Sequence, residues 1–182
     1  VVGVVVTGII YLRNISGPGS FAEEYDNVHH LGVIRTFLDT GSWLCLGVSA
    51  YGAGEAAEIA PVIGWGFYPT IWHTFAALAS SSVGIPVTMS ANVANFVFVG
   101  LAWPVTLCGF LTFLFKGNKK LLLAAALVFS AFGSFPWRFI YWGTLFPNVA
   151  SFAILAAELY FFMMIFDDKI TRGQRIEYFV MF

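Results

Sequence analysis

The chain has 182 residues, of which 59% are hydrophobic and 10% are charged, and its mean hydropathy is +0.81. Charged residues make up about a quarter of an ordinary soluble domain, so this composition excludes that class and predicts a multi-pass membrane protein. Nine Lys and Arg nearly balance ten Asp and Glu. The net charge therefore gives no sign of a nucleic-acid partner, and the positions of the charges along the chain matter more than their sum.

The chain opens with an apolar stretch at residues 1–12, "VVGVVVTGIIYL". As a helix it reaches only about 18 Å, against a hydrocarbon core of about 30 Å. We interpret it as the second half of a spanning helix. The final "RIEYFVMF" resembles the beginning of another element, so residues 1–182 are expected to be a single membrane-domain fragment.

Three longer apolar runs follow at residues 88–115, 119–136 and 147–166, and each is near or above the length that a bilayer requires. Pro104 lies inside the first of them and should kink the helix or open a local gap in its hydrogen bonds. The run at residues 70–83 is short and polar at both ends. It is expected to be a short helix that lies on or dips into the outer leaflet.

Basic residues set the expected orientation, because Lys and Arg gather in short cytoplasmic loops. They cluster in "KGNKK" (residues 116–120) and in "DDKITRGQR" (residues 167–175). Both clusters lie on the cytoplasmic side only if residues 70–83 do not span. Residues 13–87 then form an extracytoplasmic segment with short helices, and residues 167–182 are cytoplasmic.

The string "EEYDNVHH" (residues 23–30) is the most polar part of the outer segment. Ser20 and Glu23 have the spacing of a capping box, which predicts a helix from there to "DTGS". At about 100° per residue, Glu23, Asp26 and His30 share one face within about 60°, with His29 on the flank. The patch either lines a cavity or is a solvated first turn with acids at a helix N-terminus.

Two further groups are candidate substrate-binding residues. In "YPTIWH", Tyr68, Trp72 and His73 are typical of an interfacial aromatic belt, and the alternative is that His73 faces the same cavity as Asp26. The stretch "FPWRFIYWGTLFPN" contains Arg138 and ends at Asn148. Arg138 either snorkels to lipid headgroups or binds a phosphate, for which a guanidinium is well suited.

The string "YDNVHHLGVIRTFLDTGSW", followed by "YPTIWH", "AWP" and "FPWRFIYWGTLFPN", resembles the first outer loop of GT-C glycosyltransferases. It is more similar still to an uncharacterised actinobacterial family of multi-span membrane proteins thought to share the GT-C fold. The resemblance covers about residues 20–150. It implies an all-α polytopic bundle in a bacterial plasma membrane, with Asp26 at the position of a catalytic base or metal partner. Asn27 stands where the family has a second acid, and Glu23 one turn earlier is a substitute.

The resemblance implies a polyprenyl-phosphate-linked sugar donor and a role in cell-envelope polysaccharide or glycoconjugate assembly. Asp26 would act as the base, while Arg138, or a divalent metal ion held by Asp26 and His30, would supply positive charge to the leaving phosphate. We expect Asp26, His73 and Arg138 to converge on one pocket with only one of the adjacent histidines, His30. The alternative is a non-catalytic membrane scaffold or a lipid- or polysaccharide-handling protein. A transporter would need polar residues at the bilayer midplane, and only Asn92, Asn95 and Glu158 could contribute.

Overall fold

The structure is a computed structural model that describes residues 1–52, 54–59 and 66–182. Over these residues the chain is helical, with a single isolated bridge between Leu46 and Phe67 and no named strand. The helical elements in chain order are α1 (Val2–Asn14), α2 (Tyr25–Thr40), α3 (Gly54–Ile59), α4 (Ile71–Val83), α5 (Val87–Phe96), η1 (Val97–Ala102), α6 (Trp103–Leu114), α7 (Lys119–Val128), η2 (Phe129–Ala131), η3 (Gly133–Arg138), α8 (Phe139–Tyr141), α9 (Phe146–Ile165) and α10 (Arg172–Met181).

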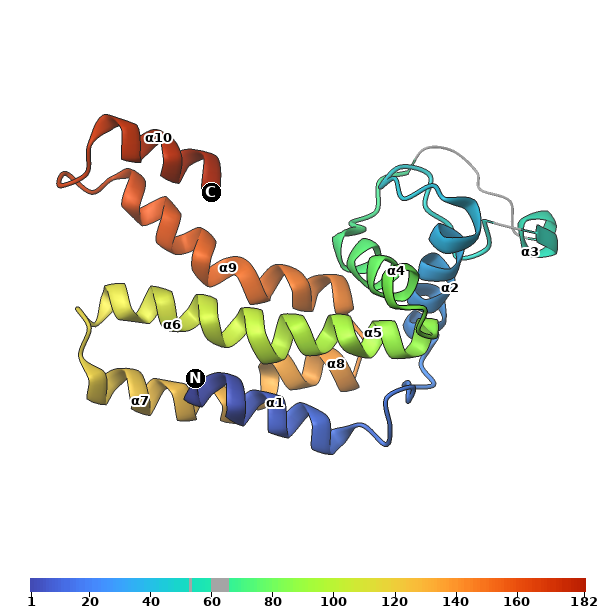
Figure 1. Cartoon of the computed structure of the whole chain (residues 1–182), viewed down its shortest axis with the longest axis horizontal. Coiled ribbons are helices and arrows are strands. Elements are labelled where there is room, and N and C mark those ends of the chain that lie inside the picture. Colours follow the sequence, from blue (N-terminus) through green and yellow to red (C-terminus); the bar gives the residue numbers. More distant parts are fainter. Residues whose placement is uncertain (53, 60–65) are drawn as a thin grey trace.

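Among the described residues, three helical segments are long and apolar enough to cross a membrane, namely Val87–Leu114, Lys119–Tyr141 and Phe146–Ile165. Their bounds lie close to the runs expected at 88–115, 119–136 and 147–166. In Figure 1 these segments and α1 form an elongated bundle, while α2, α3 and α4 gather at one end of it. The prediction of an all-α helical bundle is confirmed.

The helix that contains Pro104 is continuous but locally widened. Residues Val97–Ala102 form a π-helical segment, and the Trp103 N–H bonds to the Phe98 carbonyl five residues earlier. Proline has no N–H and its ring collides with the carbonyl four residues back, so a regular α-helix cannot pass through this position unchanged. The gap in the α-helical hydrogen bonds that was expected at Pro104 is thus the π-helical segment Val97–Ala102.

The span expected at 119–136 is less regular than its hydropathy suggests. Asn118 caps α7 by accepting the N–H groups of Lys120 and Leu121. The α-helix ends at Val128, and the backbone at Phe135 is extended (φ −127°, ψ 134°) before helical structure resumes through Tyr141. The apolar segment is therefore longer than expected and is interrupted near its α8 end.

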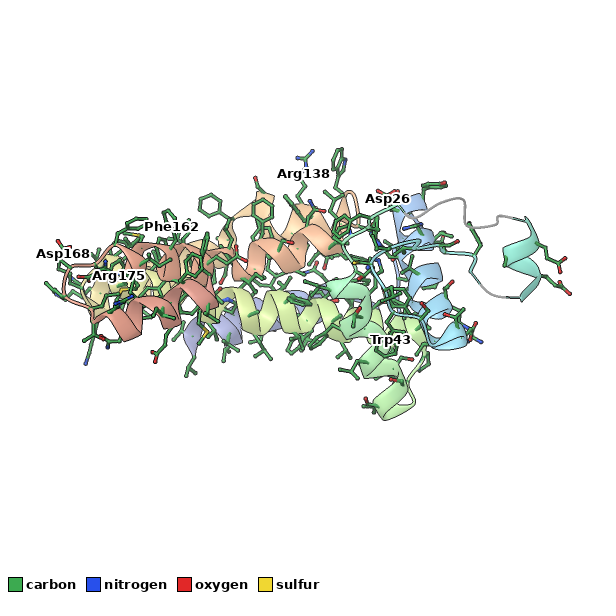
Figure 2. All side chains as sticks on the ribbon, turned by 90° about the horizontal axis from the view of Figure 1, so that it is seen from above. Asp26, Trp43, Arg138, Phe162, Asp168 and Arg175 are labelled. Atoms are coloured by element: carbon green, nitrogen blue, oxygen red, sulfur yellow. The ribbon has the colours of Figure 1, made fainter. Side chains whose placement is uncertain are left out.

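At the opposite end from α2 and α4, Figure 1 shows the α6–α7 turn and the α9–α10 turn. These two turns carry the basic clusters of residues 116–120 and 167–175. Figure 2 shows Asp168 and Arg175 at one end of the molecule and Asp26 near the other. The fold thus separates the basic clusters from the polar string "EEYDNVHH", and the side of the membrane that each end faces stays a prediction.

Helix α2 begins later than its sequence suggests. Residues 21–24 are not helical, α2 starts at Tyr25, and its N-cap residue Glu24 makes no side-chain cap bond. The capping box expected at Ser20 and Glu23 is wrong, because the Ser20 hydroxyl turns back to donate to the Gly17 carbonyl at 2.8 Å. The expected C-terminus is correct, since Gly41 adopts φ 68° and its N–H bonds to the Phe37 carbonyl.

Helix α4 is 13 residues long and is not among the segments able to span. It is seen almost end-on in Figure 1, so it runs across the long axis of the bundle. Its buried face carries Trp72, Ala76 and Ala77, each with none of its surface exposed. These side chains pack with Val33 and Ile34 of α2, so the core of this end lies between the two helices.

Candidate functional site

A buried pair of histidines joins α2 to α4. His30 Nδ1 and His73 Nε2 are 2.9 Å apart, which is a hydrogen bond whose donor depends on the ring tautomers. The two residues are 43 positions apart in the sequence. Their exposed fractions are 4% for His30 and 0% for His73. The expected meeting of these two histidines is thereby observed.

Aromatic rings enclose the pair. The rings of Trp72 and Phe146 stack with their centroids 4.8 Å apart. Both lie against the His30 ring, whose centroid is 5.7 Å from that of Trp72 and 5.3 Å from that of Phe146. The Tyr68 ring meets the rings of His73 and His29 edge-on, with centroid separations of 5.6 and 5.3 Å. The imidazoles therefore sit in an environment that disfavours a charge.

The histidine pair is uncharged at neutral pH. Burial lowers the pKa of His30 to about 4, helped by the nearby His29 and opposed by a hydrogen bond to the Thr144 backbone and by Asp26. Burial likewise lowers the pKa of His73 to about 3, with further lowering from His30 and His29. One nitrogen, His73 Nδ1, is buried without a hydrogen-bond partner. The pair can relay or accept a hydrogen bond, but it supplies no positive charge.

A small polar cavity of about 140 Å³ opens beside this pair. We call it the imidazole cavity. Its lining residues are Asp26, His29, His30, Tyr68, Leu145, Pro147 and Asn148. They come from α2, from the segment before α4 and from the start of α9, so three parts of the chain meet there. The Tyr68 N–H bonds to the Cys45 carbonyl at 2.9 Å, which fixes the position of that segment.

The structure brings together most of the expected site residues. Asp26, His30, Tyr68 and Asn148 line the cavity, and Asp26 itself is exposed at its edge. His29 lines it as well, so the expectation that only one of the two adjacent histidines would face the cavity is wrong. The His29 ring packs against Tyr68, whereas the more deeply buried His30 is hydrogen-bonded to His73.

Two expected members lie elsewhere. Glu23 is in the non-helical segment before α2, is exposed and does not line the cavity, so it shares no helix face with Asp26. Arg138 is exposed, with its guanidinium 5.0 Å from the centre of the Trp142 ring. Figure 2 shows it projecting outward from the bundle, apart from Asp26. The expected convergence of Arg138 on the pocket is wrong.

The aromatic-belt interpretation fails for Trp72 and His73, which have no exposed surface. Trp72 points into the core, where its indole N–H donates to Asn95 Oδ1 at 3.0 Å. A tryptophan at headgroup depth would keep its N–H near water. Tyr68 alone of the three is partly exposed.

A metal site at Asp26 and His30 has little support. Within the described part of the chain, no group of three or more His, Cys, Asp or Glu is placed to hold a metal ion. His30 Nδ1 is already engaged by His73. Protein sites for divalent ions use several ligands at once, so these residues do not fit a resident metal.

An apolar cavity of about 450 Å³ adjoins the imidazole cavity, and we call it the apolar cavity. Pro147 lines both cavities. Tyr68, which lines the imidazole cavity, is followed in the chain by Pro69, which lines the apolar cavity. Its apolar lining includes Trp43, Phe67, Ile71, Phe98, Ala150 and Ile154. Sequence reasoning missed this cavity and the role of Phe146, because short apolar runs do not show which side chains will face one another.

The fold and the site define an all-helical membrane protein with a buried histidine pair and paired polar and apolar cavities at one end. The chain belongs to the family of unknown function DUF6541, whose model matches residues 1–182. No curated protein and no solved structure matches the chain.

Proposed function

We propose that the chain is the substrate-binding part of a GT-C-like membrane glycosyltransferase that uses a polyprenyl-phosphate-linked sugar at the extracytoplasmic face. The observation that carries the proposal is the pairing of the two cavities. A polyprenyl-phosphate sugar is polar at one end and apolar along the rest, and the site offers a polar and an apolar cavity that share Pro147.

In this proposal the polar end of the donor lies at the open mouth of the imidazole cavity, which at about 140 Å³ holds only part of a sugar and its phosphate. Asp26 lies at the edge of the cavity, Asn148 offers an amide, and His29 offers a ring nitrogen, whereas His30 is already engaged by His73 and the Thr144 backbone. The tail fits the apolar cavity between Ile71 and Ile154. Each buried CH₂ of such a tail contributes about 0.8 kcal/mol, so even a few isoprene units give a favourable term.

The proposed reaction uses Asp26 as a general base. Its carboxylate takes the proton of an acceptor hydroxyl, the hydroxyl oxygen forms a bond to the anomeric carbon, and the bond from that carbon to the phosphate oxygen breaks. The phosphate leaves with the bonding electron pair. A positioned base typically contributes 10² to 10⁴ in rate.

A rival function is favoured by the lack of positive charge at the cavity. The two buried histidines are neutral, and Arg138 stacks on Trp142 outside the cavity. A departing phosphate needs electrostatic stabilisation. A non-catalytic protein that handles a lipid or a polysaccharide would use the same cavities and would need no such charge.

The Asp26→Asn substitution separates the two functions. The assay measures sugar transfer from a panel of radiolabelled polyprenyl-phosphate pentoses and hexoses in membranes that contain the full-length protein. We expect transfer to fall by at least ~100-fold, as for the loss of a general base, with the melting temperature unchanged because Asp26 is exposed. Glu23→Gln is the matched control, because that acid does not line the cavity. Unchanged transfer in Asp26→Asn, or no transfer by the wild type, leaves the lipid-handling function.

The sidedness is tested separately in a background without Cys45 and Cys108, which are both free thiols. A cysteine at the exposed Ser42 should react with an impermeant maleimide added to intact cells. Cysteines at the exposed Asn118 and Glu177, at the opposite end, should react only after the cells are opened. The reverse pattern would place the cavities in the cytoplasm and would contradict the proposal.

A further inference from the structure

A further cavity, of about 230 Å³ and lined by both polar and apolar side chains, lies on the other side of α2. We call it the amide cavity. It is bounded by α1, the segment at residues 15–22, α2, α5, α8 and the start of α9. It has no lining residue in common with the imidazole cavity. The polar side chains that line it are Tyr11, Asn14, Ser16, Ser20, Asn27, Thr88, Asn92, Asn95 and Tyr141.

One of the side chains that line this cavity has an acceptor without a hydrogen-bond partner. Asn27 is 2% exposed, and its Nδ2 donates to the Ala22 carbonyl at 2.7 Å. This bond fixes the amide orientation, because a flipped side chain would set oxygen against oxygen. Asn27 Oδ1 then has no hydrogen-bond partner. Burying an acceptor without a partner is unfavourable, and a ligand that donates a hydrogen bond to it would recover this cost.

The wall of the cavity is held in place independently of any ligand. Asn92 Nδ2 donates to the carbonyls of Pro18 and Ser20, at 2.9 and 2.6 Å. The Tyr11 hydroxyl donates to Asn92 Oδ1 at 3.2 Å. These bonds tie the segment that follows α1 to α5. The cavity is therefore preformed, which lowers the free energy that binding must spend on ordering the site.

The chemistry of the lining selects the class of ligand. Over the part of the chain that the structure describes, the lining contains no Asp, Glu, Lys, Arg or His. It therefore offers no charged partner to an ionised ligand, and burying an unpaired charge is costly. Side-chain amides and hydroxyls both donate and accept hydrogen bonds. Apolar contacts come from Ile15, Leu31, Ile140 and Phe146. At about 30 Å³ per water molecule, the volume corresponds to roughly eight waters, which is about the size of one sugar ring.

We propose that the amide cavity is a binding site for a small neutral polyhydroxylated ligand, such as a single uncharged sugar unit, with Asn27 Oδ1 accepting from a ligand hydroxyl. The site is separate from the imidazole cavity, so it stands whether or not Asp26 supports transfer. Phe146 lines the amide cavity on one side and contacts His30 on the other. A ligand in the amide cavity would therefore be separated from the buried histidine pair only by the Phe146 ring.

The test uses saturation-transfer NMR on the full-length protein in nanodiscs. The probes are methyl α-D-mannopyranoside, methyl β-D-glucopyranoside and D-arabinose, with glucuronate and glucosamine as charged counterparts. We expect saturable binding of at least one neutral probe and none of the charged ones. Asn27→Ala should weaken that binding by at least ~tenfold, which corresponds to the loss of one well-placed hydrogen bond.

Two further variants keep the result decisive. Thr88→Leu adds bulk to the lining. Within the described part of the chain the Thr88 hydroxyl makes no hydrogen bond that the fold would lose. This variant should also weaken binding, and it decides the matter if Asn27→Ala fails to fold. Gly109→Ala, whose added Cβ meets no atom within 4 Å and which lines neither the amide cavity nor the imidazole cavity, should bind the neutral probe as the wild type does. Equal binding of neutral and charged sugars, wild-type binding by Thr88→Leu, or binding of no sugar at all would overturn the proposal and leave a cavity filled by water only.

Discussion

Acid should weaken the packing of α2 against α4 at pH values where most carboxylates are still ionised. His30 and His73 have folded-state pKa values of about 4 and about 3, against 6.5 for an unperturbed histidine. Between these values the unfolded chain binds protons that the folded chain does not. The free energy of unfolding therefore falls as the pH drops below 6.5, and it is fully retained above that value.

The size of the effect follows from the two shifts. At pH 5 the unfolded histidines are 1.5 units below their pKa of 6.5, whereas both folded histidines are still neutral. Each pKa unit is worth about 1.36 kcal/mol, so each histidine costs roughly 2 kcal/mol and the pair roughly 4 kcal/mol. His29 adds to the same trend, because burial also lowers its pKa and Asp26 only partly opposes this.

Hydrogen exchange followed by mass spectrometry measures this loss in the amides of α2 and α4. After correction for the intrinsic exchange rate, protection in these helices should drop by about three orders of magnitude between pH 7.5 and pH 5. The amides of α6 should keep their protection, since that helix contains none of the three histidines. The double variant His30→Gln/His73→Gln should lose most of the pH dependence in α2 and α4.

Two results would refute the reasoning. One is protection in α2 and α4 that stays constant from pH 7.5 to pH 5. The other is an unchanged pH dependence in the double variant, which would assign the effect to groups other than the buried pair.

Two other predictions concern packing at the same end. Gly32→Ala places a Cβ 2.8 Å from the Cβ and the carbonyl oxygen of Ala50, so it should destabilise the protein by about 1–3 kcal/mol. Gly109→Ala, with no atom within 4 Å of its added Cβ, is the matched control and should melt at or slightly above the wild-type temperature, because alanine is the better helix former; equal melting temperatures for both variants would contradict the close approach. Trp72→Phe leaves Asn95 Oδ1 without its buried donor, so it should cost about 1–3 kcal/mol in chemical unfolding. In a double-mutant cycle with Asn95→Ala the two losses should be less than additive, and full additivity would mean that the bond contributes nothing.

The spans could be predicted from the sequence because a bilayer imposes a minimum apolar length on each of them. The segments Val87–Leu114 and Phe146–Ile165 differ by one residue at each end from the predicted runs. The interruption near Phe135 could not be predicted, because hydropathy reports burial in lipid and says little about backbone angles. The π-helical segment before Pro104 was partly predictable, since proline always removes one hydrogen bond from a helix.

The candidate site was predictable where side-chain chemistry is restrictive. Histidines are scarce in this chain, so those in "EEYDNVHH" and "YPTIWH" were reasonable partners, and His30 does meet His73. The start of α2 was not predictable from the Ser20 spacing. A hydroxyl can bond to several nearby backbone groups, and here the Gly17 carbonyl receives it instead of the helix N-terminus.

Arg138 and Trp72 show why amphipathic residues are hard to place from sequence alone. Each has a polar group on a large apolar body, so each is compatible with a lipid boundary and with an interior. The partner that each side chain meets in the fold decides between these positions. Trp72 is drawn inward by Asn95, 23 residues away, whereas Arg138 stays outside on the ring of Trp142.

The central claim, that the apolar cavity holds the tail of a polyprenyl-phosphate substrate, is tested most directly by site-specific photocrosslinking. Benzoylphenylalanine would replace Ile71, which lines the cavity, or Leu78, which is exposed elsewhere on α4 and does not line it. The probe is radiolabelled undecaprenyl phosphate in membranes that contain the full-length protein. We predict that the Ile71 variant is labelled several-fold more strongly than the Leu78 variant and that unlabelled undecaprenyl phosphate competes for this labelling. Equal labelling of the two variants, with no competition, would mean that the cavity is only part of the lipid-facing surface and would contradict the claim.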